Sequence, residues 1–311
     1  LFLLRVCEAM GVPSIAVPLL SKSKLVGLFL VRIPSTLQNV DSSRLRLVAA
    51  AARQTSLSIH LYLLIEELRS NEGLKREIEI ARQIQHDLLP QSIPHSSRFD
   101  LFAGCVTAAR VGGDYYDFFQ QGEGKVGLLI ADVAGHSVAS ALIAMSFRTS
   151  FRFFLDQGPE LGPLFGKVNE ALHNELKKSG NFLSAFYGTF DEKSRVFRYV
   201  NAGHNPPLLW NGRSGTFREL DEAGLLIGIL PGQSYQAAEV QLEAGDTLLC
   251  YTDGIVEAEN QRGEFFGQKR LEEAIRKNQS RGAREMYHYL LKEMYVFQDE
   301  HFNKDDVTLV V

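Results

Sequence analysis

The pattern of hydrophobic and polar positions divides the chain into three stretches. Near the start, two apolar runs, SIAVPLL and LVGLFLVRI, flank the polar residues SKSK, which is typical of a β-hairpin. Residues 41 to about 90 predict helix, and from about residue 98 short strands alternate with helices. Because two strands cannot form a stable domain alone, and the sequence opens at Leu1 without methionine, we expect the first module to continue upstream.

The helical stretch carries two apolar stripes. The first has the 4-3-4 spacing of a coiled-coil seam, at Leu57, Leu61, Leu64 and Leu68. Residues 71–73, Asn-Glu-Gly, predict a break, because an interior glycine costs about 1 kcal/mol relative to alanine. The second stripe runs over residues 78–88 and stops before Pro90. A helix docked on its own domain would show the same stripes, but their place between two modules favours a dimerising connector.

The remainder of the chain predicts a layered α+β domain. The expected strands are VGLLIA, SAFYGTF, RVFRYVN, PPLLW, TFREL, AAEVQL, DTLLCYT and DVTLVV, with turn signals between several of them. The expected helices are SVASALIAMSFRTSFRFFLD, LGPLFGKVNEALHNELKKS, QKRLEEAIRKN and REMYHYLLKEMYVF. Runs of strands with helices in pairs favour stacked layers over a doubly wound parallel sheet.

Composition narrows the class of protein. The length of 311 residues suits two domains, and a hydrophobic content of 45% is enough for a packed core. A net charge of −4 gives no reason to expect nucleic acid or an anionic membrane as a partner. We find no apolar run that approaches bilayer length. The three cysteines, Cys7, Cys105 and Cys250, lack disulfide or zinc spacing, which predicts a reducing, cytoplasmic setting.

Aspartates stand at the ends of several predicted strands. The run GLLIA leads into Asp132, the run TLLCYT leads into Asp253, and Asp305 precedes the strand VTLVV. Helix capping explains one such aspartate, but the recurrence, with Asp114 after a glycine pair, also suits a shared site. Carboxylates gathered at one point repel each other, and a hard cation such as Mg²⁺ or Mn²⁺ relieves that repulsion. Nearby glycines would let carbonyls and water approach: Gly112, Gly113 and Gly254.

Six ordered motifs resemble those of the bacterial SpoIIE/RsbU-type phosphatases, which are metal-dependent Ser/Thr protein phosphatases of the PPM class. They are EIARQIQHDLLPQSIP, VGGDYYDFF, ADVAGHSVASALIAM, NAGHNPPLLW, YTDGIVEAENQRGEFFG and KDDVTLVV, over about residues 75–311. The upstream piece resembles, more weakly, the C-terminal half of a GAF sensor domain. The resemblance implies an αββα sandwich at 98–311, a helical connector at 67–97 and a partial GAF-like module at 1–66.

The resemblance also implies a centre with two Mn²⁺ or Mg²⁺ ions. Asp132 would bridge both ions, with a metal-bound water as the nucleophile, and the Val133 carbonyl would complete one site. The other ligands would be Asp114, Asp253 and Asp305. Further residues would brace these ligands or bind an additional ion: Asp117, Asp306 and Gly254. The reaction would be in-line hydrolysis of a phosphoserine or phosphothreonine.

The implied substrate is a small phosphorylated regulator, an anti-sigma factor antagonist of the STAS type, in a partner-switching pathway. The alternatives are a non-catalytic module that keeps this fold, and a hydrolase of nucleotides or other small phosphoesters, although no P-loop is present. One departure favours the non-catalytic module: Ser137 stands where the family has glycine, and strain is expected if that position needs a positive φ. His136 and His204 are expected to be structural.

Overall fold

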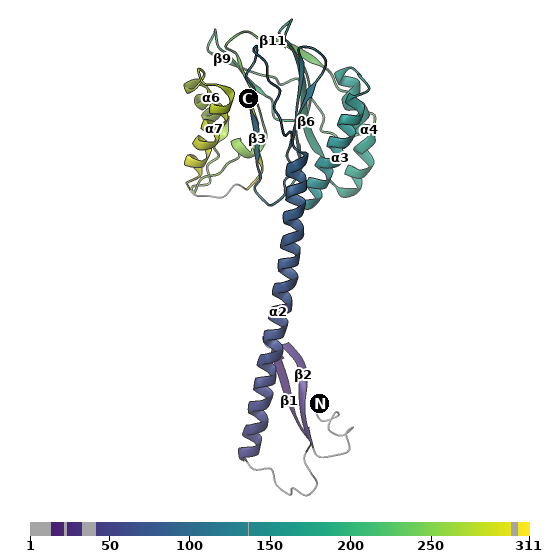
Figure 1. Cartoon of the computed structure of the whole chain (residues 1–311), viewed down its shortest axis with the longest axis vertical. Helices are drawn as coiled ribbons and strands as arrows, with labels where there is room; N and C mark the ends of the chain where they lie inside the picture. Colours follow the sequence, from purple (N-terminus) through teal and green to yellow (C-terminus); the bar gives the residue numbers. More distant parts are fainter. Residues whose placement is uncertain (1–13, 22–23, 33–41, 136, 300–303) are drawn as a thin grey trace. The chain divides into compact units, whose positions relative to one another are not determined.

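The computed structural model describes residues 14–21, 24–32, 42–135, 137–299 and 304–311. The chain forms two compact units, Leu1–Glu77 and Ile78–Val311, which are described separately below. Figure 1 shows the elements of both units in the order of the sequence.

The first unit contains the predicted hairpin. Strand β1 (Ser14–Ser21) pairs antiparallel with β2 (Lys24–Arg32), which confirms the hairpin, although turn residues 22–23 lie outside the described residues. The hairpin is tied to the helix that follows, since the Ser56 hydroxyl donates to the Leu20 carbonyl at 2.6 Å and accepts from the Leu20 amide at 3.1 Å. Leu19 and Ala52 are the buried apolar residues among the described residues of this unit. A GAF-like identity for the unit stays a prediction.

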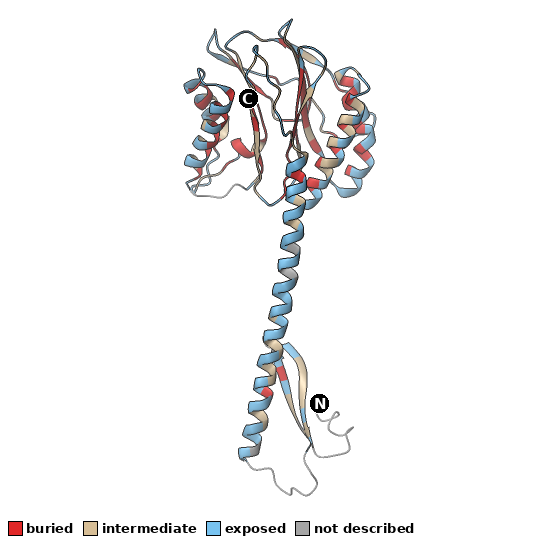
Figure 2. Cartoon of the chain, viewed as in Figure 1, coloured by how far each residue is buried: buried red, intermediate tan, exposed pale blue. Residues whose placement is uncertain are grey.

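Helix α2 (Ser42–Leu88) is one element of 47 residues. The predicted break at residues 71–73 is wrong, because the cost of one exposed glycine is small beside the hydrogen bonds of the turns on either side. Figure 2 shows that most of the described helix surface is exposed. The first leucine stripe is part of that surface, with exposed fractions of 61% for Leu57, 57% for Leu61 and 63% for Leu68.

The second unit is built on two mostly antiparallel sheets. The first has the order β10-β7-β6-β5-β4, with β11 also pairing with β7, and contains β4 (Tyr115–Gln120), β5 (Lys125–Val133), β6 (Leu183–Asp191), β7 (Val196–Ala202), β10 (Ala223–Gly224) and β11 (Ala238–Gln241). The second has the order β3-β13-β12-β8-β9 and contains β3 (Ala103–Val106), β8 (Leu208–Asn211), β9 (Thr216–Glu219), β12 (Thr247–Tyr251) and β13 (Val307–Val310). Among the described pairs of named strands, only the short β10–β7 pair is parallel, and one isolated parallel bridge joins Ala185 to Gly203.

Helices cover the outer faces of both sheets, which gives four layers (Figure 1). Helices α3 (Val138–Leu155) and α4 (Leu161–Ser179) pack on the first sheet, and α6 (Gly267–Lys277) and α7 (Ala283–Gln298) lie on the second. The short helix α5 (Asp253–Val256) follows β12. The predicted αββα architecture of this part is therefore confirmed.

Strand β5 shows why these strands read as continuous apolar runs. Leu129 and Ala131 pack in the cluster beneath α3 and α4, whereas Leu128 and Ile130 point into the cluster between the two sheets. A strand buried on both faces keeps apolar residues at every position, because neither face meets water. The same reasoning explains why Asp132, at the end of this strand, requires a special explanation.

The predicted strands and helices of this unit are present, but three strands and the short helix α5 were missed; of the strands, β10 has only two residues. Strand β4 was missed because Asp117 interrupts its apolar pattern, and β3 because the sequence AGCV is short and weakly apolar. The expectation that no apolar segment reaches bilayer length is wrong for α3, which is long and apolar enough by length and composition alone. In this structure α3 packs on β5 and α4, with Phe147 and Phe151 fully buried.

The prediction of backbone strain at Ser137 is also wrong. Ser137 has φ −111° and ψ 170°, an extended conformation open to any residue, and it is the N-cap of α3. Its hydroxyl accepts from the Ser140 amide at 3.3 Å, while the Ser140 hydroxyl accepts from the Ser137 amide at 2.8 Å. The left-handed conformation belongs to Gly135, with φ 87°. Serine therefore stabilises the helix start here.

Candidate metal centre at the sheet edge

Both sheets bring aspartates to one edge of the sandwich. Asp132 is at the C-terminal end of β5, and the antiparallel partner strand β4 begins directly after Asp114. In the other sheet, β12 ends just before Asp253, and its neighbour β13 begins after Asp305 and Asp306. The antiparallel register thus places strand ends from four different sequence regions together, as the strand-end pattern predicted.

Asp114 is fixed by hydrogen bonds that cross from the second sheet to the first. The buried hydroxyls of Thr252 and Thr308 donate to Asp114 Oδ2 at 2.8 Å and 2.6 Å. Both donors point to the same oxygen, so neither threonine engages Asp114 Oδ1. Neither threonine was predicted from the sequence, because in the segments TDG and DDVT each appears only as a polar residue near an aspartate.

Asp306 braces the loop that precedes Asp114. Its Oδ1 accepts from the Ala108 amide at 2.8 Å and its Oδ2 accepts from the Gly113 amide at 2.7 Å. The side chain is 2% exposed, whereas Asp305 beside it is only partly buried. This arrangement favours the bracing role for Asp306 over metal ligation.

Electrostatics at this edge favour cation binding. Burial and the nearby Asp253 and Asp305 raise the pKa of Asp132 to about 7, and burial with Asp305 raises the pKa of Asp253 to about 6. Burial and Asp132 raise the pKa of Asp114 well above its ordinary value. Each carboxylate is therefore costly to ionise beside the others, and a divalent cation would remove that cost.

The backbone around the aspartates leaves no room for side chains. A Cβ atom on Gly113 would lie 2.6 Å from the Val133 carbonyl oxygen, so that carbonyl faces the glycine loop. A Cβ atom on Gly254 would collide with the Asp306 carbonyl, so Gly254 contributes through its backbone. Among the residues that the structure describes, no three His, Cys, Asp or Glu side chains gather at metal-ligand spacing. The fit to a metal therefore rests on the all-oxygen donors and the glycine-lined carbonyl.

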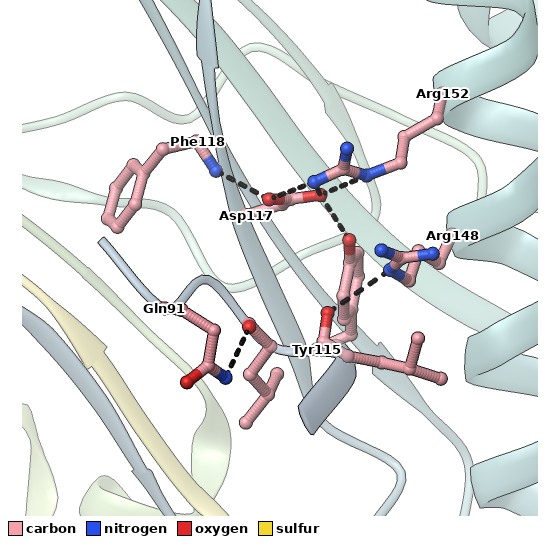
Figure 3. Close-up of polar contacts among 8 residues, drawn as sticks. Gln91, Tyr115, Asp117, Phe118, Arg148 and Arg152 are labelled. Atoms are coloured by element: carbon pink, nitrogen blue, oxygen red, sulfur yellow. Dashed lines mark hydrogen bonds and ion pairs between the residues drawn. The ribbon is translucent and has the colours of Figure 1, made fainter. Parts of the chain in front are cut away.

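Asp117 lies away from the sheet edge, in the network of Figure 3. Arg152 donates to both its oxygens at 2.8 Å, the Phe118 amide donates to Oδ1 at 2.9 Å, and the Tyr115 hydroxyl donates to Oδ2. The carboxylate is 1% exposed, so α3 and β4 are joined by a buried charged pair. With both oxygens engaged, Asp117 suits a bracing role and not a further ion.

Helix α2 contributes a residue that the sequence reasoning missed. Gln85 is buried, and its side chain donates to the Gly112 carbonyl at 2.7 Å and accepts from the Gly112 amide at 3.1 Å. The apolar stripe predicted at residues 78–88 is less buried than Gln85: Ile84 is 56% exposed, and Ile78 and Leu88 are only partly buried. A polar residue on an otherwise apolar helical face was the available signal.

His204 has the structural role expected of it. Its Nδ1 lies 2.7 Å from the Ser184 hydroxyl, and its backbone amide donates to Asn201 Oδ1 at 2.7 Å. Burial lowers its pKa to about 4, so the ring is neutral near pH 7. His136 lies outside the described residues.

The raised pKa values predict pH-dependent metal binding. Protons compete with a cation for Asp132 below about pH 7 and for Asp253 below about pH 6. Since ligands must lose their protons to bind, Mn²⁺ affinity should increase from pH 6 to pH 8. Calorimetric titration in buffers of different ionisation enthalpy would measure both affinity and released protons. An affinity independent of pH over this range would contradict the prediction.

Comparison with known proteins agrees with this geometry. The family model of stage II sporulation protein E (SpoIIE) matches residues 122–311. Phosphoserine phosphatase RsbU of Bacillus subtilis (strain 168) is 30% identical over 243 residues, which cover 77% of this chain and 70% of RsbU. Phosphoserine phosphatase RsbP of the same organism is 32% identical over 187 residues, or 59% of this chain and 46% of RsbP.

Solved structures share the fold. The SiaA-PP2C domain of Pseudomonas aeruginosa has a TM-score of 0.70 and 23% identity, over 78% of this chain and 97% of that domain. The RsbU and RsbW domains of Rv1364c from Mycobacterium tuberculosis give 0.57 and 26%, over 68% of this chain and 58% of that one.

The four-layer sandwich with aspartates at one sheet edge defines a PP2C-type, or PPM-type, protein serine/threonine phosphatase. The chain belongs to the SpoIIE family within that class. The resemblance inferred from the six motifs is thereby confirmed for the phosphatase part.

Proposed function

We propose that this chain hydrolyses phosphoserine or phosphothreonine on a small regulatory protein, a STAS-type anti-sigma factor antagonist, in a cytoplasmic partner-switching pathway. Support comes from the similarity to RsbU, which is named a phosphoserine phosphatase, and from the Mycobacterium tuberculosis protein that contains RsbU and RsbW domains in one chain. The carrying observation is that four aspartates stand beside strand ends at one edge and raise the pKa values of Asp114, Asp132 and Asp253 through their charges and burial.

Two Mn²⁺ or Mg²⁺ ions are part of this proposal. Asp132 and the Val133 carbonyl would bind at the end of β5, with Asp132 shared between the ions. Asp114, Asp253 and Asp305 would complete the centre. When bound, the ions would activate a water and stabilise charge on the transferring phosphoryl group.

The chain itself would keep this centre in place. Thr252 and Thr308 orient Asp114 by holding its Oδ2, and Asp306 holds the glycine loop against β5. Because these groups are arranged before substrate binds, little reorganisation is needed during the reaction. The backbone of Ser137 is unstrained, so the feature that favoured a non-catalytic module no longer does so.

The direct test is phosphate release from a phosphoserine STAS protein in the presence of Mn²⁺. Chelation should abolish release, and a nucleotide offered at the same concentration should not replace the protein. Release from the nucleotide alone would contradict the proposed substrate class.

We further propose that α2 pairs with a second copy of the chain through its first leucine stripe. Leu57, Leu61 and Leu68 expose more than half of their surface in one chain, and contiguous exposed leucines favour a protein contact. Replacing Leu61 and Leu64 by aspartate should give monomers in sedimentation, since each buried leucine contributes roughly 1.5–3 kcal/mol. A variant that remained dimeric would refute the seam.

The end of α2 is proposed to support the centre through Gln85. Gln85→Leu keeps the side-chain volume but removes both hydrogen bonds to Gly112, two residues before Asp114. Mn²⁺ affinity should fall by about 10–100-fold, the range seen when partners of metal ligands are lost. Gln83→Leu is the matched control, because Gln83 is exposed and bonds only Asp87 among the described contacts. Equal affinities for the two variants would contradict a role for Gln85.

A further inference from the structure

A cavity lies at the end of the sandwich opposite the aspartates. It has a volume of about 470 Å³ and lies between the two sheets. Strand β5 reaches it through Val126 and Leu128, near the start of the strand, whereas Asp132 is at its other end. Strand β13 reaches it through Val310, whereas Asp306 precedes its first residue. The cavity is therefore separate from the proposed metal centre.

The inner part of this cavity is apolar. Its buried wall comes from both sheets, at Leu128, Phe197, Leu209, Cys250 and Val310. These side chains are each at most 9% exposed, so the inner wall is shielded from water. Ligand sites typically have volumes of about 300–1,000 Å³ and apolar walls with a few polar groups at defined places.

Two arginines at the rim have no carboxylate partner among the described residues. Arg98 is exposed and lines the cavity, and no described ion pair includes it. Arg281 also lines it, with its guanidinium 5.5 Å from the centre of the Tyr289 ring, a contact that leaves its N–H donors free. A ligand with an apolar body and an anionic group could therefore contact the apolar walls with its body and the two arginines of the rim with its anionic group.

The acidic residues of the rim are already engaged. Asp100 Oδ2 accepts from the Ala283 amide at 2.7 Å, at the start of α7. Asp246 accepts from the Gly212 amide at 3.0 Å through Oδ1 and from the Glu243 amide at 2.9 Å through Oδ2. Glu243 lies 3.8 Å from Arg213. These three carboxylates keep their charge, but each already has a hydrogen-bond or ion-pair partner, whereas the guanidinium groups of Arg98 and Arg281 have no carboxylate partner among the described contacts.

We propose that this cavity binds a small amphiphile with an apolar body and a single carboxylate head. The body would occupy the space between the sheets, and the carboxylate would accept from Arg98 and Arg281. Arginine suits this task, because its planar fork matches the geometry of a carboxylate. This binding does not require metal ions or a phosphoprotein, so it is independent of the proposed phosphatase reaction.

The chain contains its own reporter for such binding. Trp210 is the single tryptophan, and its indole N–H donates to Gln279, a residue of the cavity lining, at 3.1 Å. We would titrate the full chain with decanoate, decylamine and decanol, and follow tryptophan fluorescence and heat. Decanoate should bind saturably with one site per chain and at least about 10-fold more tightly than decylamine. Equal binding of the three probes, or no saturable binding of decanoate, would overturn the proposal.

Variants locate the binding within the molecule. Replacing both Arg98 and Arg281 by alanine should weaken decanoate binding by about 10-fold or more, the loss expected for charge-assisted hydrogen bonds. Arg284→Ala is the matched control, since Arg284 is exposed in the first turn of α7, three residues after Arg281, but stacks on Phe102 and does not line the cavity. Leu248→Phe, at a partly buried wall position, should block decanoate by filling the space. Unchanged affinity in folded double-alanine and Leu248→Phe variants would place any binding elsewhere and refute the site.

Discussion

Asp132→Asn is expected to reduce phosphatase turnover by more than about 100-fold. Losing a residue that merely orients a metal ligand costs about 10–100-fold, and the proposed bridging ligand should cost more because asparagine carries no charge. The fold should survive, since Leu129 and Ala131 behind it remain packed beneath α3. Mn²⁺-dependent phosphate release from a phosphoserine protein measures the loss, with Asp156→Asn, an exposed aspartate at the end of α3, as the control.

The same variant should not lose stability when metal is removed by a chelator. In the folded chain the pKa of Asp132 is raised to about 7, above its ordinary value, so ionisation opposes folding once the pH exceeds about 4 and fully so above 7. Asparagine removes that cost, and urea denaturation at pH 8 should show a midpoint at or above that of the wild type. Turnover close to that of the wild type in a folded Asp132→Asn variant would refute the bridging role.

Arg152→Ala is expected to destabilise the phosphatase domain by about 3 kcal/mol. The change leaves the Asp117 carboxylate, 1% exposed, without its cation, and stranding one partner of a buried pair costs about 3–5 kcal/mol. We expect the lower end because 42% of the Arg152 side chain is exposed. For a domain of this size the melting temperature should fall by roughly 6–12 °C.

Two further variants distinguish the cost of leaving the buried Asp117 carboxylate unpaired from the cost of losing the packing of the arginine side chain. Arg148→Ala, one helical turn earlier, removes a single 3.2 Å hydrogen bond to the Leu88 carbonyl and should cost at most about 1.5 kcal/mol. Adding Asp117→Asn to Arg152→Ala should recover part of the lost stability, because the buried charge is then gone. If Arg152→Ala and Arg148→Ala had equal effects, the importance of the buried charge would be contradicted.

The local sequence was enough to identify those strands and helices whose hydrophobic pattern fits only one kind of secondary structure. The buried strand GLLIAD and the amphipathic helices of residues 161–179 and 267–277 could be identified because periodicity reflects which faces meet water. The recurrence of aspartates at strand ends likewise indicated a shared edge, and the ordered motifs identified the family. Strand β4 was missed because Asp117 interrupts its apolar pattern, although the ion pair with Arg152 allows this carboxylate to be buried.

Only the tertiary structure decided which polar groups form hydrogen bonds with each other. Thr252, Thr308 and Asp114 are far apart in sequence, and their hydrogen bonds exist because two sheets stack face to face. Gln85 hydrogen-bonds Gly112 because the end of α2 lies against the loop before Asp114, and local sequence does not identify that partner. Sequence periodicity reports how each segment meets water, whereas register between distant segments follows from the packing of the whole domain. That is why Thr252, Thr308 and Gln85 could not be predicted from the sequence, whereas the bracing role of Asp306 was among the expectations.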